Sequence, residues 1–260
     1  MASPILELDC VSKNFGGLKV IDSLSFKVMP GERIALIGPN GAGKTTAFNL
    51  ISDFYHIDSG RIILDGRDIT TVPSRKRIAH GIARTFQNIR LMPHLTVLEN
   101  VMIGQSAHNG SALAMLQPIN LIPGNRWRAH ARGALDAAGL GEYALAAAGA
   151  LPYGIQKRIE LVRALLSEPR ILLLDEPAAG LNPSETEDLR RQLIEISRRG
   201  VTLIVVEHDM HFIGAFCQRV IVLNFGCKIA ECSPHEAQAD PQVREAYLGS
   251  DDELGQAHAA

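Results

Sequence analysis

A glycine-rich segment, Gly38-Pro-Asn-Gly-Ala-Gly-Lys-Thr-Thr46, constrains the fold of this chain more than any other feature. It fits the pattern G-x-x-x-x-G-K-[ST], and it lies between an apolar run, Arg33 to Gly38, and a helical pattern, Gly43 to Ser52. Glycines let the backbone fold tightly around an anion, and the start of the helix adds positive potential. The segment therefore predicts a phosphate-binding loop between a strand and a helix.

The polar residues of this loop have expected partners in a bound nucleotide and its metal ion. Lys44 should reach the β- and γ-phosphates, Thr45 should supply a hydroxyl to Mg²⁺, and Thr46 should contact a phosphate oxygen. The nucleotide-binding residues of the loop are predicted to be Gly38, Pro39, Asn40, Gly41, Ala42, Gly43, Lys44, Thr45 and Thr46.

A pair of acids ends a second apolar run, Ile171-Leu-Leu-Leu-Asp175-Glu176-Pro177. Asp175 fits the carboxylate that holds the Mg²⁺ shell, whereas Glu176 points differently and fits a residue that orients or activates the attacking water. Acids that merely end a strand in a turn are the alternative interpretation. Because the phosphate loop is present as well, we favour the catalytic role.

The distribution of apolar residues predicts a mixed α/β fold. Continuous apolar runs predict buried parallel strands, and alternating segments predict an antiparallel sheet with one wetter face. The continuous runs are Arg33–Gly38, Ile171–Asp175 and Val201–Glu207, and the alternating segments are Ile5–Val11, Val20–Val28 and Arg61–Asp65. Helices are predicted over Gly43–Ser52, Thr96–Gln105, Arg126–Gly139, Gly154–Leu166, Ser184–Arg198 and Asp209–Phe216.

The segment from Gln105 to Leu151 is rich in Ala and Gly and has no continuous β-type run, so we expect a helical lobe inserted in the main domain. Its first part, Ser106 to Asn125, is expected to be a mobile or poorly ordered connection. Ser233 to Leu248 suggests two short helices before a tail without recognisable chemistry. We expect a single domain over residues 1–260, with a core in 1–86 and 167–230, the helical lobe in 87–166, and C-terminal helices and tail in 231–260.

Composition excludes several classes of protein. The 260 residues include 26 Lys+Arg, 28 Asp+Glu and 46% apolar residues, which argues against a disordered tail or a polybasic nucleic-acid binder. No apolar stretch approaches the ~18 to 20 residues of a membrane-spanning helix, and no signal peptide is expected. The four cysteines form no CxxC pair, so we expect reduced thiols in a cytosolic protein; a metal cluster of Cys227, Cys232 and His235 is disfavoured.

Taken in order, the motifs resemble those of ATP-binding subunits of ABC transporters over nearly the whole chain. They are Gly38–Thr46, Gln87 in Arg84-Thr-Phe-Gln-Asn88, Leu151-Pro-Tyr-Gly-Ile-Gln-Lys-Arg158, Leu172-Leu-Leu-Asp-Glu-Pro177, Gly180-Leu-Asn-Pro183 and His208. The chain is most similar to the branch that serves branched-chain amino-acid importers. The segments of that branch are Asp175-Glu-Pro-Ala-Ala-Gly-Leu-Asn-Pro183, Glu207-His-Asp-Met210 and Ala246-Tyr-Leu-Gly249.

The resemblance implies roles for residues outside the phosphate loop. Phe15 matches an aromatic residue that stacks on adenine, Gln87 a residue that touches Mg²⁺ and water, and His208 a histidine that contacts the γ-phosphate. A packed surface aromatic and a structural histidine are the alternatives, and a His208–His211 metal pair lacks a third ligand at a suitable spacing. The implied catalytic residues are Lys44, Gln87, Glu176 and His208, and the implied metal ligands are Thr45, Gln87 and Asp175.

The signature segment departs from the common family pattern. Pro152 and Ile155 stand where Ser and Gln are usual, and Pro152 has neither a hydroxyl nor an N–H to offer a phosphate. Gly154 still permits close approach at the start of a helix whose dipole favours an anion. We expect Gly154 to cover ATP held by an opposing subunit, more weakly than the common pattern does.

The function that the resemblance implies is ATP hydrolysis coupled to import of branched-chain or other hydrophobic amino acids. Expected partners are a second, homologous but non-identical ATPase, two integral membrane permease subunits and, indirectly, an extracytoplasmic solute-binding protein; no nucleic acid is expected. The chain would lie peripherally on the cytoplasmic face of the cell membrane, with Asn88 to Val101 forming a wall of the groove that receives a permease helix. A soluble ABC-type ATPase of DNA repair or translation, a non-hydrolysing regulatory module and a P-loop kinase are the alternatives.

Overall fold

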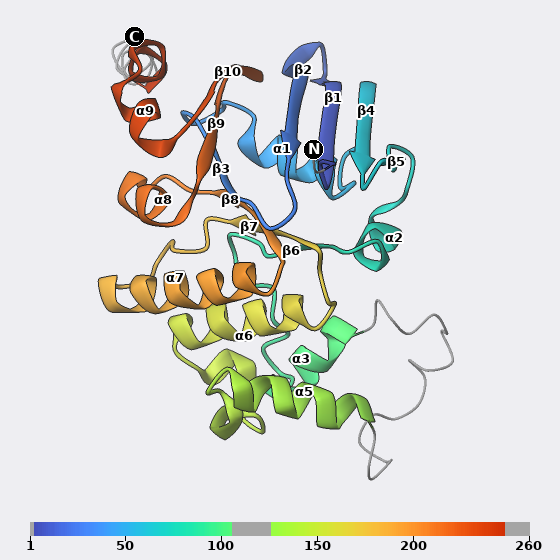
Figure 1. Ribbon diagram of the computed structural model, residues 1–260. Coiled ribbons are helices and arrows are strands. Elements are labelled where there is room, and N and C mark those ends of the chain that lie inside the picture. Colours follow the sequence, from blue (N-terminus) through green and yellow to red (C-terminus); the bar gives the residue numbers. More distant parts are fainter. Residues whose placement is uncertain (1–2, 106–125, 248–260) are drawn as a thin grey trace.

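The computed structural model describes residues 3–105 and 126–247, and their elements form two sheets with helices around them (Figure 1). The larger sheet has six strands in the order β10-β9-β3-β8-β7-β6. Its first five strands along the chain run parallel, and β10 pairs with β9 antiparallel at one edge. The strands are β3 (Arg33–Ile37), β6 (Ile82–Arg84), β7 (Ile171–Asp175), β8 (Thr202–Val206), β9 (Arg219–Asn224) and β10 (Cys227–Cys232).

A four-stranded antiparallel sheet, in the order β2-β1-β4-β5, covers one side of the larger sheet. One face of this sheet contacts the core and the other faces water, which explains why apolar and polar residues alternate in the sequence of its strands. The helix α1 (Lys44–Ile51) lies in the same core as this sheet, with Phe48 completely buried. The strands are β1 (Leu6–Phe15), β2 (Leu18–Val28), β4 (Ser59–Leu64) and β5 (Arg67–Asp68).

The central strands of the six-stranded sheet are buried on both faces, and this is why they are continuously apolar. Within β3, Ile34 and Leu36 belong to the core shared with α1, whereas Ala35 and Ile37 belong to a second core. Three helices pack against that second core, namely α7 (Pro183–Arg198), α8 (Met210–Phe216) and α9 (Pro234–Ala239).

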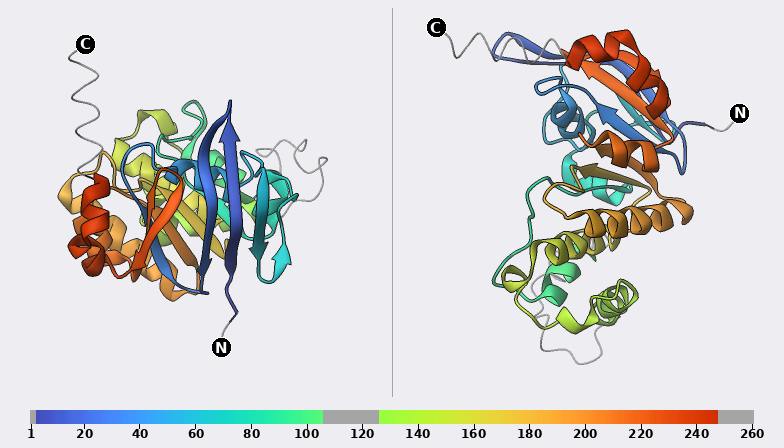
Figure 2. Two further views of the ribbon diagram at one scale, coloured as in Figure 1. Left: turned by 90° about the horizontal axis from the view of Figure 1, so that it is seen from above. Right: turned by 90° about the vertical axis from the view of Figure 1, so that its left-hand side faces the viewer.

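A third hydrophobic cluster holds together the helices at the end of the molecule opposite the antiparallel sheet (Figure 2). These are α3 (Val97–Ile103), α5 (Arg126–Ala137) and α6 (Tyr153–Leu165), with short 3-10 turns at Gly141–Tyr143 and Ala148–Ala150. Among residues 3–105 and 126–247, no helix has the length and apolar character needed to span a bilayer. The expected connection over Ser106–Asn125 lies outside the described residues.

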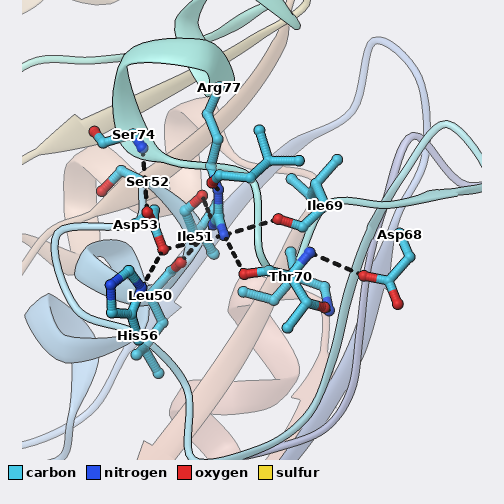
Figure 3. Close-up of polar contacts among 12 residues, drawn as sticks. Leu50, Ile51, Ser52, Asp53, His56, Asp68, Ile69, Thr70, Ser74 and Arg77 are labelled. Carbon is cyan, nitrogen blue, oxygen red and sulfur yellow. Dashed lines mark hydrogen bonds and ion pairs between the residues drawn. The ribbon is translucent and has the colours of Figure 1, made fainter.

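A buried arginine fixes the far end of α1 (Figure 3). Arg77, on α2 (Ser74–Ala79), donates to the carbonyl oxygens of Leu50 at 2.7 Å and Ile51 at 2.8 Å, and it is 1% exposed. The last turn of α1 contains no basic residue of its own. Arg77 therefore supplies, from another helix, the cation that a helix C-terminus favours.

Candidate active site

The glycine-rich segment forms the connection between β3 and α1, and two of its glycines have no substitute. Gly38 has a φ of +146°, and a Cβ atom there would lie 2.1 Å from the Leu223 carbonyl oxygen. Gly43, with a φ of +99°, is the N-cap of α1, and its Cβ would lie 2.7 Å from a methyl of Ile21. The backbone can take this path only without side chains at these positions.

The Lys44 ammonium lies across the loop and is largely buried. Its Nζ donates to the carbonyl oxygens of Gly38 at 2.6 Å and Pro39 at 2.8 Å. Burial lowers the pKa of Lys44, and the nearby carboxylates of Glu176 and Asp175 oppose that shift. A buried cation bonded only to neutral oxygens is well suited to an anionic ligand, so the loop fits a nucleotide phosphate.

The remaining loop residues differ in their exposure to solvent. Asn40 and Gly41 are exposed at its tip, whereas Pro39 and Ala42 are buried. Thr45 is exposed and Thr46 is half-buried, both in the first turn of α1. The hydroxyl expected to serve the metal ion is therefore accessible.

Asp175 ends β7 and forms a buried ion pair with Arg84 at the end of β6. The Arg84 guanidinium donates to Asp175 Oδ2 at 2.7 Å, and the two side chains are 6% and 7% exposed. The other terminal nitrogen of Arg84 donates to the side chains of Asn49 at 2.7 Å and Ser52 at 3.2 Å. Through Arg84, Asp175 is therefore connected to α1. A carboxylate fixed in this way beside the loop is suited to a divalent cation. Arg84 was not predicted, because a single arginine carries no pattern.

Two predicted residues from distant parts of the sequence contact the carboxylate of a third, Glu176. Gln87 Nε2 donates to Glu176 Oε2 at 2.6 Å, and His208 Nε2 lies 2.9 Å from Glu176 Oε1. Glu176 has a φ of +47°, which non-glycine residues adopt rarely and at a cost, and its N–H donates to the Val206 carbonyl at 2.9 Å. The turn after β7 thus directs this carboxylate toward both partners.

Lys157 connects the signature helix α6 to the same turn. Its Nζ donates to the carbonyl oxygens of Gln87 at 3.3 Å and Glu176 at 3.2 Å. Burial lowers the pKa of Lys157, opposed by nearby acids of which Glu160 has the largest effect. Lys157 was not predicted as a site residue, because a lysine inside an amphipathic helix usually faces solvent.

Gly154 and Phe15 lie on other parts of the chain. Gly154 is in the first turn of α6, close enough to Glu185 that a Cβ would lie 2.4 Å from its carboxylate. Pro152 is the N-cap of α6 and makes no side-chain cap. Phe15 ends β1, is 40% exposed, and contacts Tyr55 edge-on with ring centroids 5.0 Å apart. Neither residue shares a site with the Glu176 cluster in the single chain.

The C-terminal segment makes a contact that was not predicted, since its second helix touches the phosphate loop directly. The expected two short helices are present as α9 and residues 241–247, while Leu248 lies outside the described residues. The Tyr247 hydroxyl accepts a hydrogen bond from the Gly38 N–H at 2.9 Å. The segment therefore does contribute to the site, whereas its Ala246-Tyr-Leu-Gly249 motif had indicated only the importer branch.

A phosphate loop between a parallel strand and a helix, with acids at the end of a second strand of that sheet, defines a P-loop nucleoside triphosphatase. The chain belongs to the ABC transporter family, whose sequence model matches residues 21–179. It is an ATPase of that family, as the motif order predicted. A second model, described as "Branched-chain amino acid ATP-binding cassette transporter", matches residues 227–253.

Relatives and solved structures agree with this assignment. The chain is 40% identical over 253 residues to the high-affinity branched-chain amino acid transport ATP-binding protein BraF of Pseudomonas aeruginosa, covering 96% of this chain and 99% of the relative. It is 37% identical over 257 residues to the corresponding protein LivG of Escherichia coli, with the same two coverages. The crystal structure of an ABC transporter ATP-binding cassette in its ADP conformation superposes with a TM-score of 0.85, at 32% identity, covering 95% of this chain and 100% of that one. The predicted family and branch are thus confirmed.

Proposed function

We propose that this chain is the ATP-hydrolysing subunit of an importer for branched-chain or other hydrophobic amino acids. The observation that carries the proposal is the meeting of Gln87 and His208 at the Glu176 carboxylate, beyond the ends of strands that pair in the same sheet as β3, the strand that leads into the phosphate loop. Relatives named for branched-chain amino acid transport supply the solute class. Because these relatives are transport proteins, they favour a transporter over DNA repair or translation.

Hydrolysis would use the residues of this cluster in distinct roles. Glu176 takes a proton from a water whose oxygen bonds to the γ-phosphorus, and the bond to the bridging oxygen breaks to leave ADP and phosphate. Lys44 and His208 neutralise charge that develops on the phosphoryl oxygens. Thr45, Gln87 and Asp175 would hold Mg²⁺, which neutralises the phosphates when bound.

Two ATPase subunits are needed for a complete site in this proposal. Phe15 supplies an adenine platform on one subunit, and Gly154 of the other covers the phosphates. A dimeric ATP-binding cassette bound to ADP and phosphate is similar to this chain, with a TM-score of 0.74 at 26% identity, covering 88% of this chain and 98% of that one. The second subunit would be a homologous, non-identical ATPase, which accommodates the weaker signature at Pro152.

A groove of about 430 Å³ is the proposed docking site for a permease subunit. It lies between α2 and β6 on one side and α3 and α6 on the other. Its apolar lining includes Phe54, Ile78 and Ile103, which are 53%, 39% and 37% exposed. Phe86 and Ile103 line the groove just outside the expected wall segment, residues 88–101, none of which is among its lining residues. Docking there would hold the chain peripherally at the cytoplasmic membrane face, with the solute-binding protein engaged only through the permease.

Glu176→Gln in the assembled transporter tests the proposed function. The amide cannot accept the proton from water, so ATP hydrolysis and uptake of radiolabelled leucine should both fall by at least about 100-fold while ATP stays bound. Lys44→Ala should instead weaken nucleotide binding itself.

The control for Glu176→Gln is Glu187→Gln, which changes a half-exposed glutamate of α7 paired with Arg190. It should leave hydrolysis and uptake within about twofold of the unaltered protein. Normal turnover in the Glu176→Gln protein would contradict the catalytic assignment. Normal ATP hydrolysis by the unaltered transporter without any amino-acid uptake would contradict the solute class.

A further inference from the structure

The helix at residues 241–247 ends against the phosphate loop, although 209 residues separate the two contacting groups along the chain. Tyr247 packs against the second hydrophobic core, which also contains buried residues of α8 together with Ala237 and Val243. This packing brings the Tyr247 hydroxyl to 2.9 Å from the Gly38 nitrogen, which donates to it. The position of the hydroxyl is thus set by the hydrophobic core and not by a surface loop.

The Gly38 N–H requires such a partner. Gly38 is buried and directly follows the last residue of β3, at the point where the chain leaves the sheet. A buried N–H without an acceptor is strongly disfavoured, so nearly all such groups in proteins are paired. Gly38 has a φ of +146°, and the Leu223 carbonyl oxygen lies where a side chain would begin, so the backbone is closely surrounded at this point.

The other side of the same residue holds the loop's lysine. The Gly38 carbonyl oxygen accepts from Lys44 Nζ at 2.6 Å, so the residue is bonded through its N–H to Tyr247 and through its C=O to Lys44. Rotation of Gly38 would therefore displace the lysine that is expected to reach the phosphates.

We infer that Tyr247 is a positioning residue for nucleotide binding: its hydroxyl fixes Gly38 and thereby pre-orders the phosphate loop for ATP and ADP. The inference rests on the proposed role of that loop. It gives the C-terminal segment matched by the branched-chain model, residues 227–253, a part in nucleotide affinity. Pre-ordering acts on binding, because a loop already in its bound shape loses less freedom when the phosphates arrive.

The test removes one oxygen atom from the full chain. Tyr247→Phe keeps the ring that packs on the core and deletes the hydroxyl, including its acceptor for the Gly38 N–H. We expect the dissociation constants of ADP and ATP, measured by titration calorimetry, to rise together by about five- to tenfold, with kcat at saturating ATP within twofold. Amide hydrogen exchange at Gly38, followed by NMR, should become at least tenfold faster.

Tyr143→Phe is the matched control, since Tyr143 is a partly buried tyrosine that packs in the helical cluster near α5. It should leave both dissociation constants and Gly38 exchange unchanged within twofold. Lys44→Ala separates this inference from the proposed function, because unchanged ADP affinity in that variant would mean that the loop itself is wrongly assigned.

One result for Tyr247→Phe would overturn the inference while Lys44→Ala still weakens binding, namely unaltered affinity for both nucleotides. If the melting temperature fell in that case, Tyr247 would have a purely structural role.

Discussion

At Glu176, two side chains share one carboxylate, and the residue that carries it has a backbone conformation that glutamate rarely adopts. Sequence reasoning predicted Gln87, Glu176 and His208 separately, from motif order. It could not predict that they bond to one another, because their positions depend on three different strand ends meeting at one sheet edge. Arg84 and Lys157 were missed for a related reason, since isolated basic residues have no recognisable spacing. The catalytic roles of Gln87, Glu176 and His208 stay predictions.

The cysteines give a prediction at the same scale. Burial raises the pKa of Cys217 to about 12, so only about one molecule in ten thousand carries its thiolate at pH 8. Cys10 and Cys227 are exposed free thiols. A disulfide reagent at pH 8 should modify Cys10 and Cys227 in the folded protein, and Cys217 only after denaturation, as peptide mass spectrometry would show. Equal labelling rates for Cys217 and Cys227 in the folded chain would contradict this.

At the scale of elements, the strongly patterned strands and helices were predicted within a few residues. The strand β3 and the helix α6 are examples, because each combines a clear apolar pattern with a motif at its end. The elements β6 and α2 were missed, since three and six residues are too few to show a period. The strand β9 was also missed, although its run Val220 to Leu223 is as apolar as β8.

Arg77 provides the prediction for these elements. Besides the end of α1, its guanidinium bonds the carbonyl oxygens of Ile69, Thr70 and Val72 at 2.8 to 3.0 Å, and it lies 3.4 Å from Asp53. Arg77→Met would leave these buried groups without their partner, so the free energy of unfolding should fall by about 3 to 5 kcal/mol in chemical denaturation.

The control for this variant lies on the same helix. Arg75→Met changes an exposed arginine and should alter the free energy of unfolding by less than about 0.5 kcal/mol. If both variants were equally stable, the buried arginine would not support α1 as the structure indicates.

At the scale of the whole molecule, motif order predicted the family. The described residues of the chain pack around three hydrophobic clusters. The division into core and helical lobe stays a prediction. The contact between the C-terminal helix and the phosphate loop could not be predicted, because it depends on how α8 and α9 pack on the sheet. No local pattern near Tyr247 specifies that packing.

Assembly with a permease gives the prediction at this scale. Ile78→Asp places a charge in the groove at a side chain that is 39% exposed, so it should greatly reduce co-purification with membrane subunits while ATP affinity stays within twofold. Leu145→Asp is the control, because Leu145 is 70% exposed and does not line this groove. Full recovery of the membrane subunits with the Ile78→Asp protein would place the permease elsewhere.

The anchoring of α1 at both ends has a mechanical consequence. The helix begins at Lys44 in the phosphate loop and ends at carbonyls held by Arg77, whose neighbour Ile78 lines the groove. Its eight residues form a rod about 12 Å long, and hydrogen bonds along the axis make such a rod stiff. Because both ends of α1 are bonded to their surroundings, the phosphate loop and the groove wall beside Ile78 are joined by one short rigid element, and a shift of either end would move the other.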